Sequence, residues 1–169
     1  INYQNPLARK LIKQFKYEPF VKELALPLAS LIINHFQLFE KKPPLSDFLL
    51  IPVPLEKRKL KWRGFNQTEE IAKNLANFFR LPLISDVLSK IKTTPAQVEL
   101  TAEARRENIK GVFLAKNQDL IKNRKILLID DIYTTGATLN ECAKVLREAG
   151  AREVTGLVVA RAQPEEDKF

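Results

Sequence analysis

Residues 126–138 read ILLIDDIYTTGAT, an apolar run followed by two adjacent carboxylates and a turn of small residues. The run 126–129 is too short for a helix and consists of isoleucine and leucine, which indicates a strand buried on both faces of a parallel sheet. Asp130 and Asp131 should therefore lie at the carboxyl end of that strand. Ligands of open α/β sheets collect at this edge, so we expect an α/β fold with a binding site there.

The turn after the two acids has the composition of a phosphate-binding loop. Glycine allows a tight turn close to a ligand, and a helix that begins near residue 138 would point its N-terminal N–H groups at a phosphate. Threonine hydroxyls add further donors. The residues expected to bind the phosphate are Thr134, Thr135, Gly136 and Thr138.

The two carboxylates suit sugar hydroxyls better than a phosphate, which they would repel. A cis-diol offers two O–H donors to acceptor-only carboxylates, and a Mg²⁺ ion joining the diol to a pyrophosphate would reduce the repulsion. We expect Asp130 and Asp131 to lie at a solvent-facing strand end and to hold the metal indirectly, through ribose hydroxyls or water. A strand that simply ends in a polar turn is the alternative.

This stretch resembles the signature of type I phosphoribosyltransferases that binds phosphoribosyl pyrophosphate (PRPP): four apolar residues, two acids and a Thr-Thr-Gly-x-Thr loop. The resemblance implies a parallel sheet flanked by helices, with the ribose hydroxyls of PRPP on Asp130 and Asp131 and its 5-phosphate on residues 134–138. It also implies displacement of pyrophosphate at the anomeric carbon, with Mg²⁺ neutralising the leaving group. The whole loop then belongs to the site: Tyr133, Thr134, Thr135, Gly136, Ala137 and Thr138.

A second stretch is strongly basic and follows another apolar strand, which ends at Ile51-Pro52-Val53-Pro54-Leu55. Five cations in one short loop would suit a polyanion, although a solvated basic loop is the alternative. Arg63 is the strongest choice, because a planar guanidinium can grip pyrophosphate oxygens in pairs. The five cations are Lys57, Arg58, Lys59, Lys61 and Arg63.

The Val-Pro-Leu start of this stretch and its Arg-Gly-Phe-Asn-Gln end, residues 63–67, resemble the ComF/GntX group of phosphoribosyltransferase-like proteins. Some members of that group serve DNA uptake in natural competence. The resemblance implies that the loop receives pyrophosphate, with contacts from Pro54, Leu55, Arg58 and Arg63. We assign catalysis to Arg63 together with Asp130 and Asp131.

A third stretch, residues 90–108, also resembles the ComF group, through Thr-x-x-Gln-x-x-Leu and a downstream Arg-x-Asn. The resemblance implies the mobile hood loop that closes over substrate, which would exclude water and bring cations onto the departing pyrophosphate. The expected contacts are Lys92, Gln97 and Arg106. A polar connecting loop with a short amphipathic helix explains the pattern equally well.

One departure from that group concerns cysteine. Its members commonly carry a four-cysteine zinc module ahead of the transferase-like domain, whereas Cys142 is the only cysteine here. One cysteine cannot build a tetrahedral thiolate site or an intrachain disulfide, so we expect no zinc in this chain. Because the chain begins at Ile1 and contains no methionine, we expect it to be a fragment or domain of a longer protein.

Composition indicates a single domain, since 169 residues with 45% apolar content can bury one core. No apolar run reaches the length of a membrane span and the start lacks a signal-peptide pattern, so we expect a cytoplasmic protein. The net charge of +8 favours anionic partners but does not choose between a sugar phosphate and single-stranded DNA. Whether the chain forms a homo-oligomer stays open.

Hydrophobic patterning predicts helices over residues 20–39, 68–79 and 138–149 and strands over 83–88 and 154–160. This alternation is typical of a right-handed parallel sheet covered on both sides.

We divide the chain into an N-terminal helical portion packed on the core (1–44), a phosphoribosyltransferase-like domain (45–163) and a frayed tail (164–169). The N-terminal helix should dock through a face that carries Leu11 and Phe15. A surface for single-stranded DNA is the alternative for this helix. Its solvated basic back is expected to consist of Arg9, Lys10, Lys13 and Lys16.

Two functions of different class remain open. The first is a domain that binds PRPP with Mg²⁺ and transfers, or once transferred, the phosphoribosyl group to a nitrogen nucleophile. No residue identifies an acceptor, so activity as a pentosyltransferase is left open. The second is a non-catalytic single-stranded DNA-binding accessory of the natural transformation machinery, working beside a competence helicase. DNA affinity that falls steeply with salt would indicate the second.

Overall fold

The computed structural model describes residues 1–17, 19–38, 45–94 and 102–162. Its central sheet has three parallel strands in the order β1-β4-β5, and a separate antiparallel pair is formed by β2 and β3. The strands are β1 (Phe48–Pro52), β2 (Leu88–Lys90), β3 (Phe113–Ala115), β4 (Lys125–Tyr133) and β5 (Glu153–Arg161). The predicted parallel sheet is confirmed.

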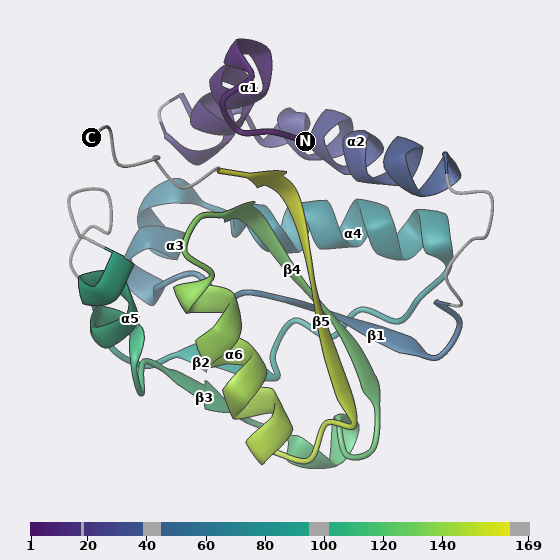
Figure 1. The fold of residues 1–169 in the computed structure, drawn as a ribbon, viewed down its shortest axis with the longest axis vertical. Helices are drawn as coiled ribbons and strands as arrows, with labels where there is room; N and C mark the ends of the chain where they lie inside the picture. The colour runs from purple at the N-terminus through teal and green to yellow at the C-terminus, as the bar shows by residue number, and fades with distance from the viewer. Residues whose placement is uncertain (18, 39–44, 95–101, 163–169) are drawn as a thin grey trace, which may run out of the picture.

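Helices cover both faces of this sheet, with α2 and α4 on one side and α6 on the other (Figure 1). The helices are α1 (Pro6–Lys16), α2 (Ala25–Gln37), α3 (Lys57–Arg63), α4 (Gln67–Phe79), α5 (Ala102–Ile109) and α6 (Ala137–Glu148), with short 3-10 helices at Lys22–Leu24 and Gln118–Leu120. No helix among the described residues is long and apolar enough to cross a membrane.

Strand β4 is central because its side chains alternate between two buried clusters. Leu127 and Ile129 pack with residues of α1, α2 and α4, whereas Ile126 and Leu128 pack with residues of α6, β2 and β3. All four are at most 3% exposed. Burial on both faces explains why the sequence shows an unbroken apolar run instead of alternation.

The register leaves the two acids beyond the end of β1. Strand β1 pairs with β4 from Lys125 to Ile129, and the last contact is the N–H of Val53 with the carbonyl of Ile129, at 2.9 Å. Strand β4 then continues to Tyr133, paired with β5 alone. The neighbouring strand therefore departs just before Asp130, which leaves one side of β4 unpaired at the acids.

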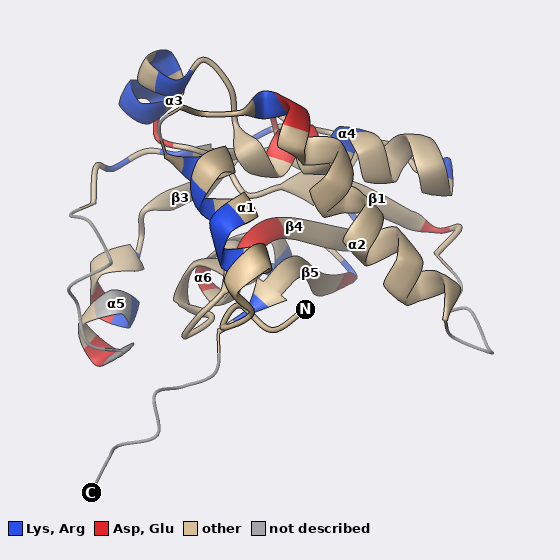
Figure 2. Ribbon diagram, turned by 90° about the horizontal axis from the view of Figure 1, so that it is seen from above, with Lys and Arg blue, Asp and Glu red and all other residues tan. Residues whose placement is uncertain are grey.

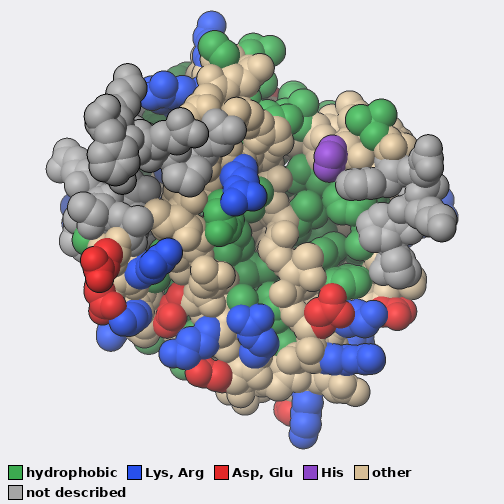
Figure 3. All heavy atoms as spheres, viewed as in Figure 1, with side chains coloured by type: hydrophobic (Ala, Val, Ile, Leu, Met, Phe, Trp, Pro, Cys, Tyr) green, Lys and Arg blue, Asp and Glu red, His purple; other side chains and the backbone are tan. Residues whose placement is uncertain are grey.

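Strand β5 forms one edge of the sheet. Residues 1–3 cover only its C-terminal end, where the N–H of Tyr3 contacts the carbonyl of Arg161 at 2.9 Å. Further along the strand, Leu157 and Val158 are half-buried. Figure 3 shows hydrophobic side chains at the surface near the centre of the view.

Several predicted elements differ in detail. The basic stretch forms α3 and not a loop, because lysine, arginine and leucine favour a helix and Gly64, at φ 82°, ends it. The predicted strand over 83–88 is a single bridge from Leu83 to Leu50, followed by β2. The helix predicted from residue 20 begins at Ala25, since Phe20 adopts a φ of 53°.

Helix α1 docks through the predicted face, with Phe15 in the core and Leu11 partly buried against it. Its buried residues are Ala8, Ile12 and Phe15, and the Phe15 ring lies 5.6 Å from that of Phe65. Leu7 is 65% exposed. The helix is capped by Asn5, whose Oδ1 accepts hydrogen bonds from the N–H groups of Leu7 and Ala8.

We predict that Phe15→Ala lowers the free energy of unfolding by about 3–5 kcal/mol, because it leaves a cavity at a fully buried position. Leu7→Ala, on the same helix but largely exposed, should cost less than about 0.5 kcal/mol. Urea denaturation followed by circular dichroism measures both. Equal losses in the two variants would contradict the packing described for α1.

Candidate functional site

Asp130 and Asp131 are buried, at 9% and 4% exposure, and do not lie at a solvent-facing strand end as predicted. The alternation of β4 directs Asp131 toward the side of the sheet that α1 covers. Asp130 is close enough to Cys142 of α6 for its negative charge to add to the burial that raises the pKa of that thiol. The N–H of Asp131 donates to Oδ1 of Asp130 at 2.8 Å. The strand end thus carries two carboxylates shielded from bulk water.

Lys16, the last residue of α1, forms an ion pair with Asp131. Its Nζ lies 3.0 Å from Oδ1 and 2.9 Å from Oδ2, and Figure 2 shows the basic residues of α1 beside the acidic end of β4. The assignment of Lys16 to a solvated basic back was therefore wrong. Its position four residues after the buried Ile12 was the available signal, since residues i and i+4 share a helix face.

Burial and charge shift the proton equilibria of this cluster. Burial, reinforced by the charge of Asp131, raises the pKa of Asp130 to about 7, although Lys16 opposes the shift. Burial alone would lower the pKa of Lys16, but the charges of Asp131 and Asp130 outweigh it and raise that pKa. Burial also raises the pKa of the Cys142 thiol. Cys142 is fully buried, as expected for a small apolar residue.

The loop after the acids has the geometry of a tight turn into a helix. Gly136 has a φ of 74°, a left-handed conformation that residues with a side chain rarely adopt, so this position favours glycine; a Cβ there would also lie 2.7 Å from the Tyr133 hydroxyl oxygen. The N–H of Ala137 lies 3.4 Å from Oγ1 of Thr135. Helix α6 begins at Ala137, has Thr138 in its first turn and has no acidic residue there. Its N-terminus therefore keeps the partial positive charge that attracts anions.

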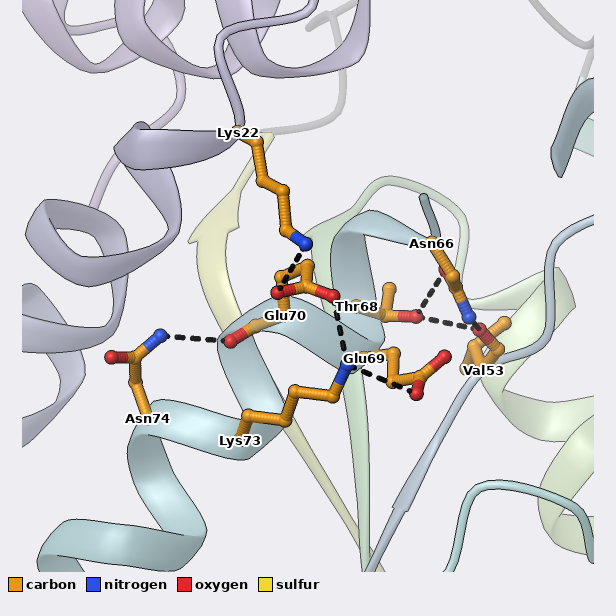
Figure 4. Close-up of polar contacts among 8 residues, drawn as sticks. All are labelled: Lys22, Val53, Asn66, Thr68, Glu69, Glu70, Lys73 and Asn74. Atoms are coloured by element: carbon orange, nitrogen blue, oxygen red, sulfur yellow. Dashed lines mark hydrogen bonds and ion pairs between the residues drawn. The ribbon is translucent and has the colours of Figure 1, made fainter. Parts of the chain in front are cut away.

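The segment between β1 and α4 is fastened by a buried polar contact that the sequence did not reveal. The carbonyl of Val53 accepts from Nδ2 of Asn66 at 3.1 Å and lies 2.6 Å from the hydroxyl of Thr68 (Figure 4). Thr68 also lies 2.9 Å from Oδ1 of Asn66. This contact joins the end of β1 to the start of α4 and so fixes both ends of the segment that carries Pro54 and Leu55.

The structure brings Arg63 toward the acids. It is the last residue of α3, it lies 5.4 Å over the ring of Phe20, and its charge interacts with that of Asp131. Its Nε and Nη1 atoms are buried without a hydrogen-bond partner in the described part of the protein. The guanidinium therefore has two donors that no described protein group satisfies, close enough to Asp131 for their charges to interact. Arg58 is exposed on the same helix.

The residues predicted for the hood are not joined to the acids. Lys92 is exposed after β2 and Arg106 is exposed on α5, and in the described ranges no hydrogen bond or ion pair links either to Asp130 or Asp131. Gln97 lies outside the described residues.

Another contact at this end of the molecule links the start of the hood to the basic segment. Oε1 of the buried Glu56 lies 3.2 Å from the hydroxyl of Thr93, while Oε2 has no partner among the described residues. Nζ of Lys90 donates to Oγ1 of Thr94 at 2.7 Å, and burial lowers the pKa of Lys90. Neither Glu56 nor Lys90 was predicted as a site residue, because each is a single charge in a segment whose other residues determined the interpretation.

The carboxyl groups of Asp130 and Asp131 suit a metal ion that binds together with a phosphate-bearing substrate. Among the residues that the structure describes, no group of three or more His, Cys, Asp and Glu side chains is arranged to hold a metal ion. Mg²⁺ is commonly bound by one or two carboxylates together with substrate phosphates and water. The oxygen donors of the two acids fit that pattern.

Residues 61–168 match the family described as the phosphoribosyl transferase domain. The chain belongs to this family. Competence protein F of Haemophilus influenzae is 37% identical over 114 residues, which cover 67% of this chain and 50% of that protein. Competence protein ComFC of Bacillus subtilis is 32% identical over 167 residues, covering 94% and 61%. The resemblance to the ComF group is confirmed.

The DNA utilization protein YhgH of Escherichia coli is 30% identical over 154 residues, covering 90% of this chain and 66% of that protein. The phosphoribosyl transferase chain thus spans between half and two thirds of the length of these three relatives.

Solved structures confirm the type I phosphoribosyltransferase fold. The allosteric regulatory enzyme of purine biosynthesis matches with a TM-score of 0.56 and 15% identity over 87% of this chain and 30% of that chain. Glutamine PRPP amidotransferase from B. subtilis, complexed with ADP and GMP, matches with a TM-score of 0.55 and 16% identity over the same shares. At such identities the likeness concerns the fold alone.

We predict that Asp130→Asn changes the pH dependence of stability. Folded Asp130 keeps its proton up to about pH 7, whereas the unfolded chain releases it near the ordinary value of 3.8. Folding therefore takes up a proton between these values, and the stability of the wild type falls as the pH rises through this window. The variant should melt higher than the wild type at pH 8, by about 2–4 °C for each kcal/mol regained, and lose that advantage at pH 4.

Thermal melts between pH 4 and pH 8 test this expectation, with Asp119→Asn as the control because Asp119 is exposed. A difference between Asp130→Asn and wild type that stays constant across this range would refute the assigned pKa.

Proposed function

We propose that this phosphoribosyl transferase domain binds PRPP, or another ribose 5-phosphate compound, together with Mg²⁺. The observation that carries the proposal is the pairing of two buried carboxylates with the Gly136 turn at one end of β4. The carboxylates are acceptors for vicinal hydroxyls, and the N-terminus of α6 is a site for the 5-phosphate. The same end of β4 therefore offers acceptors for the ribose hydroxyls and donors for the 5-phosphate.

Arg63 extends the same site to a pyrophosphate. Two of its donors, Nε and Nη1, have no partner among the described residues, and a guanidinium presents its N–H groups in pairs, Nε with Nη2 or Nη1 with Nη2, to phosphate oxygens. Mg²⁺ bound with PRPP would supply the neutralising charge on the pyrophosphate. The chain's own residues would orient the ribose through Asp130 and Asp131 and receive the leaving group at Arg63.

A domain that binds PRPP in this way could also catalyse transfer of its phosphoribosyl group. In phosphoribosyl transfer, the bond from the anomeric carbon to the pyrophosphate oxygen breaks and a bond to a nitrogen nucleophile forms. Positioning and electrostatic stabilisation by Asp130, Asp131 and Arg63 would serve that step. The names of the relatives associate the domain with competence and DNA utilization, so we propose a role in DNA uptake or in nucleotide-linked metabolism.

Calorimetric titration of PRPP tests the proposal. The wild type should show saturable binding that depends on Mg²⁺. The variant Asp130→Asn with Asp131→Asn should bind about 100-fold more weakly or worse, because it replaces both carboxyl groups that would accept hydrogen bonds from the ribose hydroxyls. Asp119→Asn removes an exposed carboxylate and should bind like the wild type. Unchanged PRPP affinity in a folded double variant would contradict the assignment of Asp130 and Asp131 to the ribose hydroxyls.

Helix α3 favours a second candidate function, a non-catalytic accessory that binds single-stranded DNA. Its four exposed cations, at positions 57–59 and 61, accompany Trp62, which is 60% exposed. Cations that follow a phosphate backbone and an exposed aromatic ring that stacks on bases are the elements of such a surface. Figure 2 shows these Lys and Arg residues concentrated on α3.

Fluorescence anisotropy with a single-stranded oligonucleotide tests this candidate. Arg58→Ala with Lys61→Ala should weaken binding and reduce the slope of log K against log salt by about 0.7 for each DNA phosphate that the variant no longer neutralises. The control, Lys110→Ala with Lys144→Ala, removes the same charge from the α5–β3 connection and from α6, and it should leave the slope unchanged. Equal effects of both pairs would indicate general attraction by net charge and would argue against a DNA site on α3.

A further inference from the structure

We propose that Lys16 is a positioning residue of the sugar-phosphate site, which holds the Asp131 carboxylate ready for the ligand's hydroxyls. Helix α1 would then complete the site as well as pack on the core. This inference rests on the proposed function of the two acids. It assigns a specific role to a lysine that lies 115 positions away from its partner in the sequence.

The ion-pair geometry leaves Asp131 able to bind a ligand. Lys16 contacts both carboxylate oxygens, at 3.0 Å and 2.9 Å. An ionised carboxylate accepts about four hydrogen bonds, so roughly one lone-pair site on each oxygen remains for an O–H donor. The ammonium also fixes the orientation of the carboxylate, since it bridges both oxygens. The ion pair itself therefore leaves acceptor capacity on Asp131 for the hydroxyls of a ligand.

Charge balance gives Lys16 a reason to stay when a ligand binds. Asp131 has a side chain that is 5% exposed, and Asp130 comes directly before it in the strand. Two buried carboxylates in sequence repel each other and cannot rely on solvent for compensation. Arg63 is the other cation whose charge interacts with Asp131, but its two buried donors are unpartnered among the described residues. Lys16 alone makes the direct contact among the described cations.

The end of α1 is anchored to the pyrophosphate side of the site. Phe15 packs against Phe65, with ring centroids 5.6 Å apart. Phe20 makes an edge contact with Trp62, at 4.7 Å, and lies under Arg63, at 5.4 Å.

Phe20 also adopts a positive φ, 53°, which costs energy for a residue with a side chain and persists only where the surroundings impose it. Phe15 and Phe20, which flank Lys16 in the sequence, are therefore both held against residues 62–65, and the Lys16 ammonium is not that of a free surface lysine.

Calorimetry on three variants tests the role of Lys16. The ligands are ribose 5-phosphate and 2-deoxyribose 5-phosphate, which differ by one hydroxyl of the diol. Lys16→Met should weaken ribose 5-phosphate binding by about 10-fold or more, because the carboxylate loses its fixed orientation and its compensating charge. Lys16→Arg keeps charge and donors and should stay within about 3-fold of the wild type. Lys13→Met removes an exposed charge from the same helix turn and should have no effect.

The preference for the ribose over the deoxyribose compound separates positioning from general stability. Because Lys16 acts through a hydroxyl acceptor, Lys16→Met should reduce this preference, whereas a merely loosened fold would weaken both ligands alike. If Lys16→Met does not fold, Lys16→Gln takes its place, with the same expectations.

Three outcomes would overturn the inference. If Lys16→Met binds ribose 5-phosphate as tightly as Lys13→Met does, the ion pair has only a structural role. Tighter binding by Lys16→Met would identify Lys16 as a competitor of the ligand. A wild type that binds neither ribose 5-phosphate nor PRPP would overturn the proposed function itself, and the inference with it; the wild-type titration alone distinguishes that case.

Discussion

Two adjacent carboxylates at the end of a buried strand repel each other and lose hydration, and much of the structure is arranged around that constraint. The cost of holding Asp130 and Asp131 there is reflected in the raised pKa of Asp130. Lys16 offsets part of it by direct contact, and Arg63 contributes charge from a greater distance. The helices that deliver these cations are themselves fixed by aromatic contacts, with Phe15 against Phe65.

The strand geometry explains why the constraint arises at this place. Strand β4 is apolar on both faces from Ile126 to Ile129, so a charge within that run would lie inside one of the two cores. At Ile129 the pairing with β1 stops, while pairing with β5 continues to Tyr133. The acids thus occupy the first positions where β4 has a free side, yet they remain on a rigid strand. A rigid backbone with one open side is well suited to hold recognition groups in place.

Local sequence signals predicted the elements that depend on local physics. The apolar run identified β4, and Gly136 was recognised from its place in the turn before α6. Long-range partners were not predictable in this way: the helix face of Lys16 could be inferred from Ile12, but its partner Asp131 lies 115 positions away. Neither did the sequence disclose that Val53 accepts from Asn66 across the basic segment, because both groups look like ordinary loop residues. The acids were placed correctly along the chain, but the burial of Asp131 depends on α1, whose Lys16 contacts it.

The most direct test of the sugar-phosphate site is a crystal structure of the protein with bound ribose 5-phosphate. We predict the 5-phosphate at residues 134–138, before the N-terminus of α6, and the ribose hydroxyls on Asp130 and Asp131, with Lys16 still in contact with Asp131. A phosphate bound instead along α3, with the two carboxylates unchanged and without ligand contacts, would contradict the assignment.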